Sequence, residues 1–508
     1  MLRGSSWGTT AAVVATILLV SGVVGGGVQL GDGGAAVSGV VDTASAEQSG
    51  DVRVENPARD NVDGDGNTGA DETGDGDDVY GSIRAGVGNA SDTSRVEVAP
   101  GTYRERGVSI AKNVTVVATG GPDRTTLNGS QFPLTPAFDI EGVAAPVVAG
   151  FSFADYGTAV NATGSGNWTI RDSVFRDNEY FGVNAFGSAG AWTVRDSTFK
   201  YNQESGVQAS RSSGAWTVRD STFRDTEDGV DAFGSAGNWS VRDSTFRYNE
   251  HGVRASNSSG GWSVRESTFR ENRYAGVRTS HSSGNWSARD STFRNNLYFG
   301  VEAFNSSGAW TVRDSTFRNN GIQAIDSSGA WTVRNSTFGS NEHGGITADG
   351  SSGDWSVRES TFENNSAGVD AFGSSGAWTI RNTTFRDNGL GVSALETSGA
   401  WEVHRSTIVD SEGSGISAVY AAPAGTATRN YWGQASGPTT DQCVGNVTCR
   451  PGLSEPPGSS LDGAAAAYDT DDDGAISIGE LAGAATDFAG DELSITELSQ
   501  VALAFART

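Results

Sequence analysis

Tryptophan recurs at a nearly constant interval through the middle of the chain. Eleven of these residues follow one another at steps of 21 to 24 residues: Trp168, Trp192, Trp216, Trp239, Trp262, Trp286, Trp310, Trp331, Trp355, Trp378 and Trp401. Each unit reads approximately Gly-Ala/Asn-Trp-Thr/Ser-Val-Arg-Asp-Ser-Thr-Phe-Arg-x-Asn, then a variable stretch, Gly-Val-x-Ala and a Ser/Gly-rich return. A unit of about 24 residues cannot bury an apolar side of its own, so successive units must stack on one another.

The units are built from strands rather than helices. Apolar residues alternate at period two, as in Trp192 and Val194, and Gly, Asn and Ser interrupt them every few residues. This pattern predicts short strands joined by tight turns. Stacked strands lie about 4.8 Å apart, so like residues form columns. We expect Val194, Phe199 and Val207 to point inward and Arg195 to point outward.

Two columns are predicted to hold the stack in register. The residue three positions after the phenylalanine is Asn178, Asn202, Asn249, Asn272, Asn296, Asn320, Asn341, Asn365 or Asn388, with Thr226 as the exception. Stacked amides at a turn form hydrogen bonds from coil to coil, so we interpret this column as a structural asparagine ladder. The evenly spaced tryptophans are interpreted in the same way, as a stacked aromatic ladder and not a sugar platform.

Composition excludes several classes of protein. The chain has 508 residues with 70 Gly, 11 Pro and 36% hydrophobic residues. It is therefore neither a Leu-rich globule, nor a collagen with a Gly-X-Y period, nor a Pro-rich disordered chain. The formal charge of −26 divides into −1 over residues 1–46, −9 over 47–78, −6 over 79–452 and −10 over 453–508. Such a field repels phosphate and attracts cations, so we expect no nucleic-acid partner.

The basic residues are almost all arginine. Lys112 and Lys200 are the only lysines, against 33 arginines. This Lys-poor, acidic balance resembles that of secreted proteins of salt-loving archaea. The alternative interpretation is an acidic tail and linker with no adaptation to salt.

The N-terminal segment indicates export. Arg3 precedes an apolar run, Ala11–Val24, and Ala44-Ser45-Ala46 offers a small-residue cleavage site. We interpret residues 1–46 as a signal peptide and 47–78 as an acidic disordered linker. The apolar run is shorter than the roughly 20 residues of a spanning helix, so no transmembrane anchor is expected in the mature chain. The predicted location is extracellular, in solution or at the cell surface.

The two cysteines, Cys443 and Cys449, are close together near the end of the repeat region. In an exported chain an even pair predicts one small disulfide loop. A two-thiol metal site is the weaker alternative, because no histidine or further cysteine lies nearby.

The repeat region resembles the right-handed parallel β-helix superfamily, whose familiar members are pectate and pectin lyases. Val96-Glu97-Val98-Ala99-Pro100-Gly101-Thr102-Tyr103 resembles a first coil, and Asn430-Tyr431-Trp432-Gly433 with Gly437-Pro438 resembles a closing coil. Residues 83–87 could form a short capping helix. The resemblance implies an all-β solenoid over residues 79–450. It also raises the alternative of a polysaccharide lyase or glycoside hydrolase, with a site in the irregular coils 104–165 or near residue 320.

No catalytic motif of that superfamily is identified, and whether the protein is an enzyme stays open. An acidic column (Asp172, Asp196, Asp220, Asp243, Glu266, Asp290, Asp314 and Glu359) runs beside an arginine column from Arg171 to Arg381. Because both recur in almost every coil, we interpret them as a mutually neutralising surface ladder. The histidines, His251, His281, His343 and His404, share no column and are expected to be exposed turn residues.

The position after Gly-Val does vary between coils, and aromatic residues lie near it. Polar, charged and aromatic groups along one edge of a rod suit an extended carbohydrate. The candidate ligand-binding residues are Tyr180, Phe181, Asp231, Arg254, Tyr274, Arg278, Tyr298, Phe299 and Glu302. The alternative is turn variability without a ligand. The 21-residue step between Trp310 and Trp331 deletes three residues from the same stretch and predicts a notch there.

The C-terminal region carries the most specific motif. After a Pro/Gly/Ser linker at 451–460, the sequence matches a calcium-binding EF-hand loop, with Gly474 at the sharp turn. The predicted ligands are Asp469, Asp471, Asp473, the carbonyl of Ala475, Ser477 and Glu480. A degenerate second element at 493–498 echoes the end of the first loop. Residues 461–508 thus resemble a dockerin module with Ca²⁺ as cofactor, which implies a cohesin-like scaffold as partner.

Overall fold

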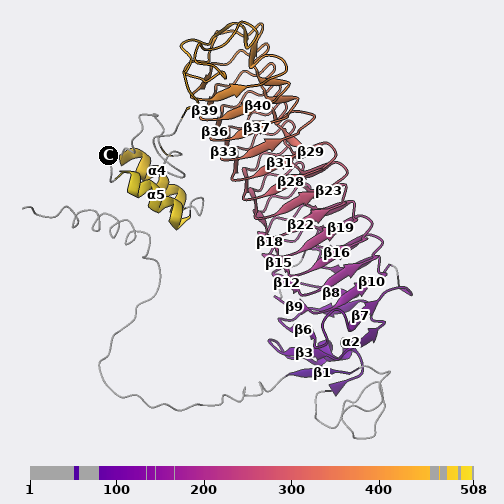
Figure 1. The fold of residues 1–508 in the computed structure, drawn as a ribbon. Coiled ribbons are helices and arrows are strands. Elements are labelled where there is room, and N and C mark those ends of the chain that lie inside the picture. The colour runs from indigo at the N-terminus through magenta and orange to yellow at the C-terminus, as the bar shows by residue number, and fades with distance from the viewer. Residues whose placement is uncertain are drawn as a thin grey trace, which may run out of the picture. The chain divides into compact units, whose positions relative to one another are not determined.

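The computed structural model describes residues 51–55, 79–457 except 133, 143, 144 and 165, then 468, 478–489 and 494–505. Residues 47–456 form one compact unit, and the chain from Pro457 onward belongs to a second. The first unit is a solenoid of stacked coils in which each regular coil contributes one strand to each of three parallel sheets (Figure 1). The predicted parallel β-helix is therefore confirmed.

Sheet A carries the tryptophan strands and, in the described chain, has 18 strands. They are β1 (Val52–Val54), β2 (Val79–Tyr80), β3 (Arg95–Val98), β6 (Thr115–Ala118), β9 (Val147–Ala149), β12 (Trp168–Arg171), β15 (Trp192–Arg195), β18 (Trp216–Arg219), β21 (Trp239–Arg242), β24 (Trp262–Arg265), β27 (Trp286–Arg289), β30 (Trp310–Arg313), β33 (Trp331–Arg334), β36 (Trp355–Arg358), β39 (Trp378–Arg381), β42 (Trp401–His404), β45 (Gly425–Thr426) and β47 (Val447–Thr448).

Sheet B carries the phenylalanine strands and has 14 described strands. They are β4 (Gly101–Tyr103), β7 (Thr125–Asn128), β10 (Ser152–Ala154), β13 (Val174–Arg176), β16 (Thr198–Lys200), β19 (Thr222–Arg224), β22 (Thr245–Arg247), β25 (Thr268–Arg270), β28 (Thr292–Arg294), β31 (Thr316–Arg318), β34 (Thr337–Gly339), β37 (Thr361–Glu363), β40 (Thr384–Arg386) and β43 (Thr407–Val409).

Sheet C carries the Gly-Val strands and has 15 described strands. They are β5 (Val108–Ile110), β8 (Phe138–Ile140), β11 (Thr158–Asn161), β14 (Phe181–Asn184), β17 (Ser205–Gln208), β20 (Asp228–Asp231), β23 (His251–Arg254), β26 (Ala275–Arg278), β29 (Phe299–Glu302), β32 (Gly321–Gln323), β35 (Ile346–Thr347), β38 (Ala367–Asp370), β41 (Leu390–Ser393), β44 (Ile416–Ala418) and β46 (Cys443–Gly445).

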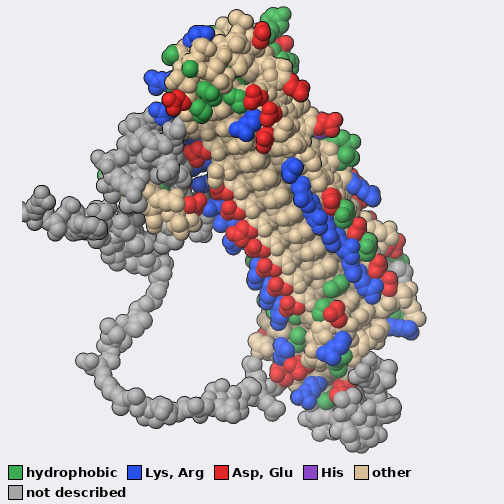
Figure 2. Space-filling view, viewed as in Figure 1, with side chains coloured by type: hydrophobic (Ala, Val, Ile, Leu, Met, Phe, Trp, Pro, Cys, Tyr) green, Lys and Arg blue, Asp and Glu red, His purple; other side chains and the backbone are tan. Residues whose placement is uncertain are grey.

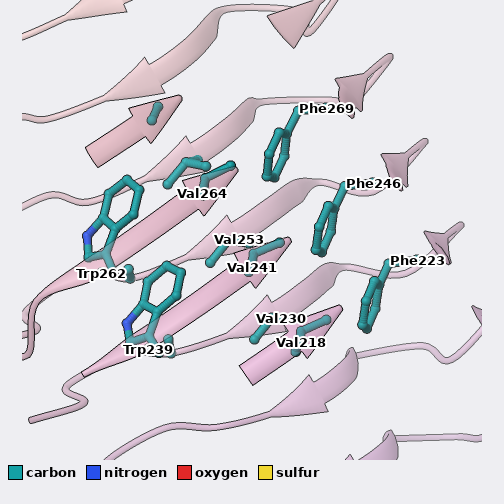
Figure 3. Close-up of a cluster of buried hydrophobic side chains, with 14 of the residues drawn as sticks. Val218, Phe223, Val230, Trp239, Val241, Phe246, Val253, Trp262, Val264 and Phe269 are labelled. Atoms are coloured by element: carbon teal, nitrogen blue, oxygen red, sulfur yellow. The ribbon is translucent and has the colours of Figure 1, made fainter. Parts of the chain in front are cut away.

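Two aromatic columns fill much of the interior. The eleven tryptophan rings from Trp168 to Trp401 stack with centroids 4.5–5.0 Å apart and planes within 12° of parallel. The phenylalanine rings from Phe153 to Phe385 stack at 4.6–5.0 Å. Figure 3 shows part of this arrangement, with valines between Trp239 and Trp262 on one side and the phenylalanine column on the other. The predicted aromatic ladder and inward columns are confirmed.

The asparagine ladder runs along the corner between sheets B and C. The Nδ2 of Asn249 donates to Oδ1 of Asn272 at 3.1 Å, and that of Asn272 donates to Oδ1 of Asn296 at 2.8 Å. Asn272 Nδ2 also donates to the carbonyl of Phe246 at 3.3 Å, and Thr226 joins the ladder through its hydroxyl. These bonds satisfy buried backbone groups at the turn, as the sequence predicted.

Serine ladders at the other two corners were not predicted. Between sheets A and B, Ser244 Oγ donates to the carbonyl of Arg242 at 2.7 Å and accepts the amide of Ser221 at 3.2 Å. Between sheets C and A, Ser258 Oγ donates to the carbonyl of Ala232 in the preceding coil at 2.7 Å. Each corner of the coil therefore has its own column of small polar side chains.

Glycine is abundant because the coils approach one another closely. A Cβ on Gly284 would lie 2.0 Å from the carbonyl oxygen of Gly260, and one on Gly252 would lie 2.5 Å from both the carbonyl of Gly276 and the ring of Phe269. Real Cβ atoms do not approach other atoms this closely, so these columns admit only glycine.

The acidic column has a backbone role beside its electrostatic one. Asp196 and Asp220 both have φ of 50°, a left-handed conformation that Asp and Asn tolerate better than most residues. Their carboxylates pair with Arg195 at 2.5 Å and Arg219 at 2.8 Å. Alternating red and blue side chains follow this edge in Figure 2. The neutralising surface ladder is therefore present.

The N-terminal end of the solenoid begins earlier than predicted. Strand β1 lies within the stretch expected to be a disordered linker and pairs in parallel with β2 and β3. Val52 and Val54 are buried against the next coil, which explains why this segment is ordered. The predicted capping helix is present as α2 (Ile83–Asn89), with the side chain of Ser82 accepting the amide of Ala85.

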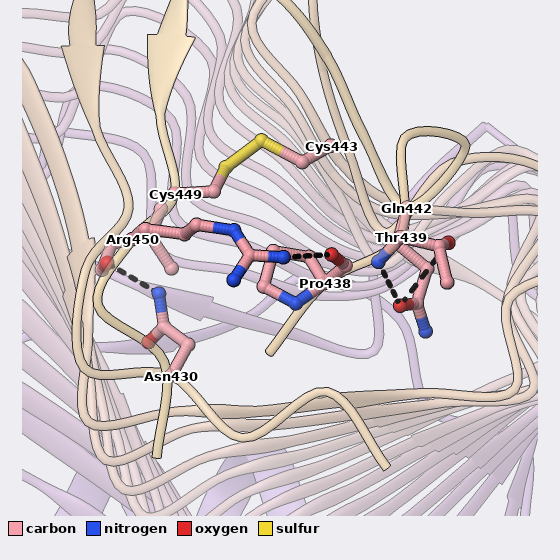
Figure 4. Close-up of a disulfide and its surroundings, with 8 residues drawn as sticks. Asn430, Pro438, Thr439, Gln442, Cys443, Cys449 and Arg450 are labelled. Carbon is pink, nitrogen blue, oxygen red and sulfur yellow. Dashed lines mark hydrogen bonds between the residues drawn. A yellow bond between two sulfur atoms is a disulfide. The ribbon is translucent and has the colours of Figure 1, made fainter. Parts of the chain in front are cut away.

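The C-terminal end is closed by an irregular coil. Cys443 and Cys449 form a disulfide that connects β46 in sheet C to the residue after β47 in sheet A (Figure 4). Arg450 donates to the carbonyls of Ser436 at 3.1 Å and Pro438 at 3.2 Å. This network holds the chain over the last coil.

The second unit contains two described helices, α4 (Ile478–Ala489) and α5 (Ile495–Phe505). Among the described residues of this unit, Tyr468, Leu481, Ala484, Leu498 and Val501 are buried. Ser494 and Glu497 form a reciprocal capping box at the start of α5. Among the residues that the structure describes, none of the helices has the length and apolar character needed to cross a bilayer.

Candidate functional site

A local irregularity in sheet C places two side chains of each strand on its outer face. In β20 and β23 the register pairs Asp228 with His251 and Asp231 with Arg254, and the glycine of Gly-Val is skipped. Gly229 and Val230 both face the interior, because a Cβ on Gly229 would meet the ring of Phe246 and Val230 is fully buried. The residues on either side of Gly-Val therefore project outward.

Four ionisable residues gather there: Asp228, Asp231, His251 and Arg254. His251 Nδ1 lies 2.9 Å from Asp228 Oδ1, and both side chains are almost fully buried. Arg254, which is one third exposed, bridges two carboxylates, with Nε 3.1 Å from Asp228 Oδ2 and a terminal nitrogen 2.9 Å from Asp231 Oδ2. The remaining imidazole nitrogen, Nε2, is buried and has no hydrogen-bond partner in the described chain.

A second ion pair lies in the next two coils. Arg278 Nε is 3.1 Å from Glu302 Oε2, and Ser280 Oγ donates to the other oxygen at 3.3 Å. The Arg278 guanidinium also lies 5.2 Å from the ring centroid of Tyr274. The nearby Glu302 carboxylate adds to the effect of burial in raising the pKa of Tyr274. The pair thus continues the charged cluster along sheet C.

Aromatic rings stand beside these charges. Tyr274 and Tyr298 have ring centroids 5.2 Å apart, and His251 packs 5.2 Å from Tyr274. Tyr298 also reaches His343 at 6.4 Å, although His343 lies two coils further on. Tyr298 is 42% exposed, so its ring is available to a ligand.

A shortened coil explains how Tyr298 contacts His343 two coils further on. Only residues 319 and 320 connect β31 to β32, whereas residues 295–298 connect β28 to β29. The register of β29 against β32 shifts between Phe299 and Val301. Because the intervening coil lacks its side chains at this edge, residues of the coils on either side meet across it. The predicted shortening of the coil at this edge is confirmed.

Burial has the largest effect on the pKa of Asp228. Desolvation raises the pKa of Asp228, while its hydrogen bond to His251 and the charge of Arg254 oppose that rise. Glu227 next to it also has a raised pKa, through partial burial and the charges of Asp228 and Glu250. Asp228 and Glu227 therefore hold their protons more readily than free carboxylates do.

The structure gathers most of the predicted ligand-binding residues into this cluster. The column after Gly-Val is confirmed, because each of its residues pairs in register with the next one along sheet C: Asn184, Gln208, Asp231, Arg254, Arg278 and Glu302. Tyr180 and Phe181 lie apart, because two coils separate the strand of Phe181 from that of His251. We use "sheet C cluster" for Asp228, Asp231, His251, Arg254, Tyr274, Arg278, Tyr298, Phe299 and Glu302.

Asp228 and His251 were missed from the sequence. The expectation that His251 is an exposed turn residue is wrong: it is the first residue of β23 and is 3% exposed. His404 is also in a strand, whereas His281 and His343 are exposed and lie in turns, as expected. The sequence does indicate this contact, because Asp228 and His251 are 23 residues apart, which is one repeat, and residues one repeat apart lie on top of one another.

The predicted calcium ligands Asp469, Asp471, Asp473, Ala475 and Ser477 lie outside the described residues. Glu480 lies in the first turn of α4 and is 7% exposed. The described chain contains no group of three or more histidine, cysteine or acidic residues arranged to hold a metal.

Comparison with protein families identifies the class. The family model for the right-handed beta helix region matches overlapping segments at residues 137–269, 187–338, 228–385 and 320–437, together more than half of the chain. The chain belongs to this family, which agrees with the three parallel sheets.

Similar solved structures come from several kinds of protein. The A-module of the Azotobacter vinelandii mannuronan C-5 epimerase AlgE6 is 13% identical with a TM-score of 0.39, over 74% of this chain and 96% of that one. The periplasmic alginate epimerase AlgG is 12% identical with a TM-score of 0.37, over 70% and 77%. PfbA, a surface adhesin of Streptococcus pneumoniae, is 11% identical with a TM-score of 0.39, over 67% and 90%. No curated protein sequence matches the chain significantly.

Proposed function

We propose that the protein is an extracellular or cell-surface β-helix that binds a polysaccharide across the sheet C cluster. The observation that carries this proposal is that a run of charged residues occurs in only one part of the described sheet C. In the other sheet C strands from β14 to β41 the same outward position is mostly Asn, Gln, Thr or Ser, whereas charged residues fill it in four consecutive strands. These four strands lie beside exposed aromatic rings and next to the shortened coil.

The chemistry suits a sugar chain. Tyr274 and Tyr298 offer ring faces on which pyranose rings stack, and Arg254 and Arg278 offer guanidinium N–H groups for hydroxyls or carboxylates. Because both arginines are one third exposed while their acidic partners are almost fully buried, the acids fix the arginines in place. The ligand then meets donors that are already oriented, which lowers the entropy cost of binding.

A polysaccharide array tests the proposal. The wild-type chain is expected to bind one class of neutral or acidic glycan, and Tyr298→Ala or Tyr274→Ala is expected to weaken that binding about three- to tenfold. Phe372→Ala is the matched control, because Phe372 is a 38% exposed aromatic residue following strand β38, two coils beyond the shortened one. Absence of binding across the array, or an equal loss in the control, contradicts the proposal.

The second candidate function is a polysaccharide lyase or glycoside hydrolase, and the Asp228–His251 pair favours it. A carboxylate 2.9 Å from one imidazole nitrogen fixes the orientation of the ring and leaves the other nitrogen for proton transfer. Nε2 of His251 is buried beside Tyr274, so turnover requires Tyr274 to move.

An activity assay separates the two candidates. Acidic polysaccharides are incubated with the chain, calcium and high salt, and unsaturated or reducing ends are measured. Release that disappears in His251→Ala and persists in His281→Ala supports an enzyme. Binding without release supports the first candidate.

The parts outside the solenoid complete the proposal. Residues 1–46 direct export, so the N-terminus of the secreted chain is expected near Glu47. Residues 461–508 bind Ca²⁺ through the loop that ends at Glu480 and present a dockerin-like surface to a cohesin-like scaffold. Calorimetry of the whole chain is expected to give a calcium signal that Asp471→Ala removes and Asp354→Ala, in the solenoid, retains.

A further inference from the structure

A second basic column, separate from the sheet C cluster, follows the last position of the sheet B strands. Seven consecutive strands from β13 to β31 place a cation there in direct register: Arg176, Lys200, Arg224, Arg247, Arg270, Arg294 and Arg318. At about 4.8 Å per coil the row is about 29 Å long. Figure 2 shows it as an unbroken blue line over the face where Figure 1 labels β16, β19 and β22.

The row ends abruptly. The next two residues in the same column are Gly339 and Glu363, and only then does Arg386 follow. A column required by the fold alone would continue, because the Thr-Phe strands around it do continue to β40. The cations are therefore not explained by the packing of the repeat.

These cations are only partly neutralised. Arg176, Arg224 and Arg270 pair with the acidic residue that follows each of them, at 3.0, 3.3 and 3.6 Å. The other four are followed by Tyr201, Tyr248, Asn295 and Asn319, and no ion pair within 4.0 Å joins them to an acid of the described chain. Seven cations less three acids leave a net charge of +4 along the row, in a chain of charge −26.

Two tyrosines beside the row have an unfavourable backbone conformation. Tyr201 and Tyr248 have φ of 57° and 58°, at a turn position where most other coils place Asp, Asn, Glu or Ser. A bulky ring in the left-handed region costs free energy, so such a residue points to a functional constraint. Both rings are nearly half exposed, and Arg224 and Arg247 lie over them at 5.0 and 5.9 Å.

We propose that this row, with Tyr201 and Tyr248, is a binding track for an anionic polysaccharide that runs along the solenoid axis. Its carboxylate or sulfate groups would pair with the cations, and its sugar faces would stack on the two rings. The first residues of the same strands, Thr198 to Thr316, form a parallel column of hydroxyl groups for further hydrogen bonds.

The spacing favours a glycan over a nucleic acid. Duplex DNA carries one charge per about 1.7 Å, far denser than one cation per coil of about 4.8 Å. An extended uronate chain carries one carboxylate per sugar, a spacing of the same order as the coil repeat. The charge of −26 also repels a densely charged polyphosphate more strongly than a glycan.

The test uses the full chain and three probes: polygalacturonate, heparin and single-stranded DNA. Binding is measured against salt over the range in which circular dichroism shows the fold intact. The triple variant Lys200→Gln, Arg294→Gln, Arg318→Gln is expected to lose at least about tenfold in affinity for the glycans and to release about two to three fewer ions on binding. Tyr201→Asn is expected to weaken glycan binding without lowering the melting temperature.

Arg386→Gln is the matched control, since Arg386 occupies the same column beyond the break and should not affect binding. The triple substitution should lower the affinity by the same factor in the wild-type chain and in a Tyr298→Ala background, which separates this proposal from the sheet C cluster. Wild-type affinity in the triple variant, an equal loss in Arg386→Gln, or tighter binding of DNA than of either glycan overturns the proposal.

Discussion

At the scale of single residues, neighbours decide what a repeated side chain does. Arg195 is followed by Asp196 and is neutralised by it, whereas Arg294 is followed by Asn295 and is exposed without an acidic partner in the described chain. The same applies to glycine, whose importance depends on the distance to the next coil. Substitutions at equivalent residue types therefore have very different consequences.

Gly252→Ala is expected to destabilise the solenoid by about 2 kcal/mol or more, because the new methyl group meets backbone and the Phe269 ring at 2.5 Å. Gly88→Ala is the control. Gly88 lies in helix α2 with no atom within 4 Å of the added Cβ, so that variant should be neutral or up to about 1 kcal/mol more stable. Equal denaturation midpoints for the two variants would contradict the close-packing argument.

Asp228 makes stability depend on pH in a defined direction. Its pKa is raised in the folded state above the ordinary 3.8, so the folded state binds the proton more tightly than the unfolded one. The stability this contributes is fully present below about pH 4 and is lost as pH rises through the folded-state pKa. The melting temperature of wild type relative to Asp228→Asn should therefore fall between pH 3.5 and pH 7, and a relative rise would show that the ion pairs outweigh burial.

At the scale of elements, strands of two to four residues are stable only because each pairs with the strands of neighbouring coils. A lone coil would bury little, so its corners must hold their hydrogen bonds with side chains. The asparagine ladder and the two serine ladders do this at the three corners. The stability of each coil therefore depends on polar columns as well as on the aromatic ones.

Asn272→Ala is expected to cost about 3 kcal/mol, because it removes the acceptor of the Asn249 backbone amide, one of two acceptors of the Asn249 side-chain amide, and the donor to the Phe246 carbonyl. Thr226→Asn, which inserts the consensus residue at the exception, should change the free energy of unfolding by less than about 1 kcal/mol. Chemical denaturation measures both. A ladder that contributed nothing would give the same midpoint for Asn272→Ala as for wild type.

The disulfide is expected to act locally. Replacing Cys443 and Cys449 together by serine should cost about 2 kcal/mol, the value for a short closed loop. In a stacked array this loss stays near the end where it occurs. Hydrogen exchange should therefore speed up in β46 and β47 while β20 to β26 keep their protection. Uniform loss of protection would indicate a single cooperative unit.

At the scale of the whole molecule, the charge is concentrated outside the repeats. Residues 47–78 and 453–508 carry −19 of the total of −26. At about 1 M salt the Debye length is about 3 Å, so repulsion among these acids is screened. If the chain is adapted to salt, its melting temperature should rise steadily from 0.1 to 2 M sodium chloride. A flat or falling curve would leave the acidic segments as ordinary tail and linker.

The sequence alone determined the repeat, the stack of short strands and the contents of the inward columns. Coils are related by translation, so residues one repeat apart lie on top of one another whatever the details. This is why the tryptophan stack, the asparagine ladder and the variable column from Asn184 to Ser393 could be predicted. The Asp228–His251 contact follows from the same rule but was overlooked, because only the position after Gly-Val was compared.

The tertiary structure decided which neighbouring columns interact. The skipped glycine in sheet C puts Asp228 and Asp231 on the same face, where Arg254 bridges both. The shortened coil brings Tyr298 to His343 across a missing turn. Contacts of this kind run sideways between columns and depend on local bulges and on the reach of individual side chains. A repeat period fixes what lies above and below a residue, but it carries no information about what lies beside it.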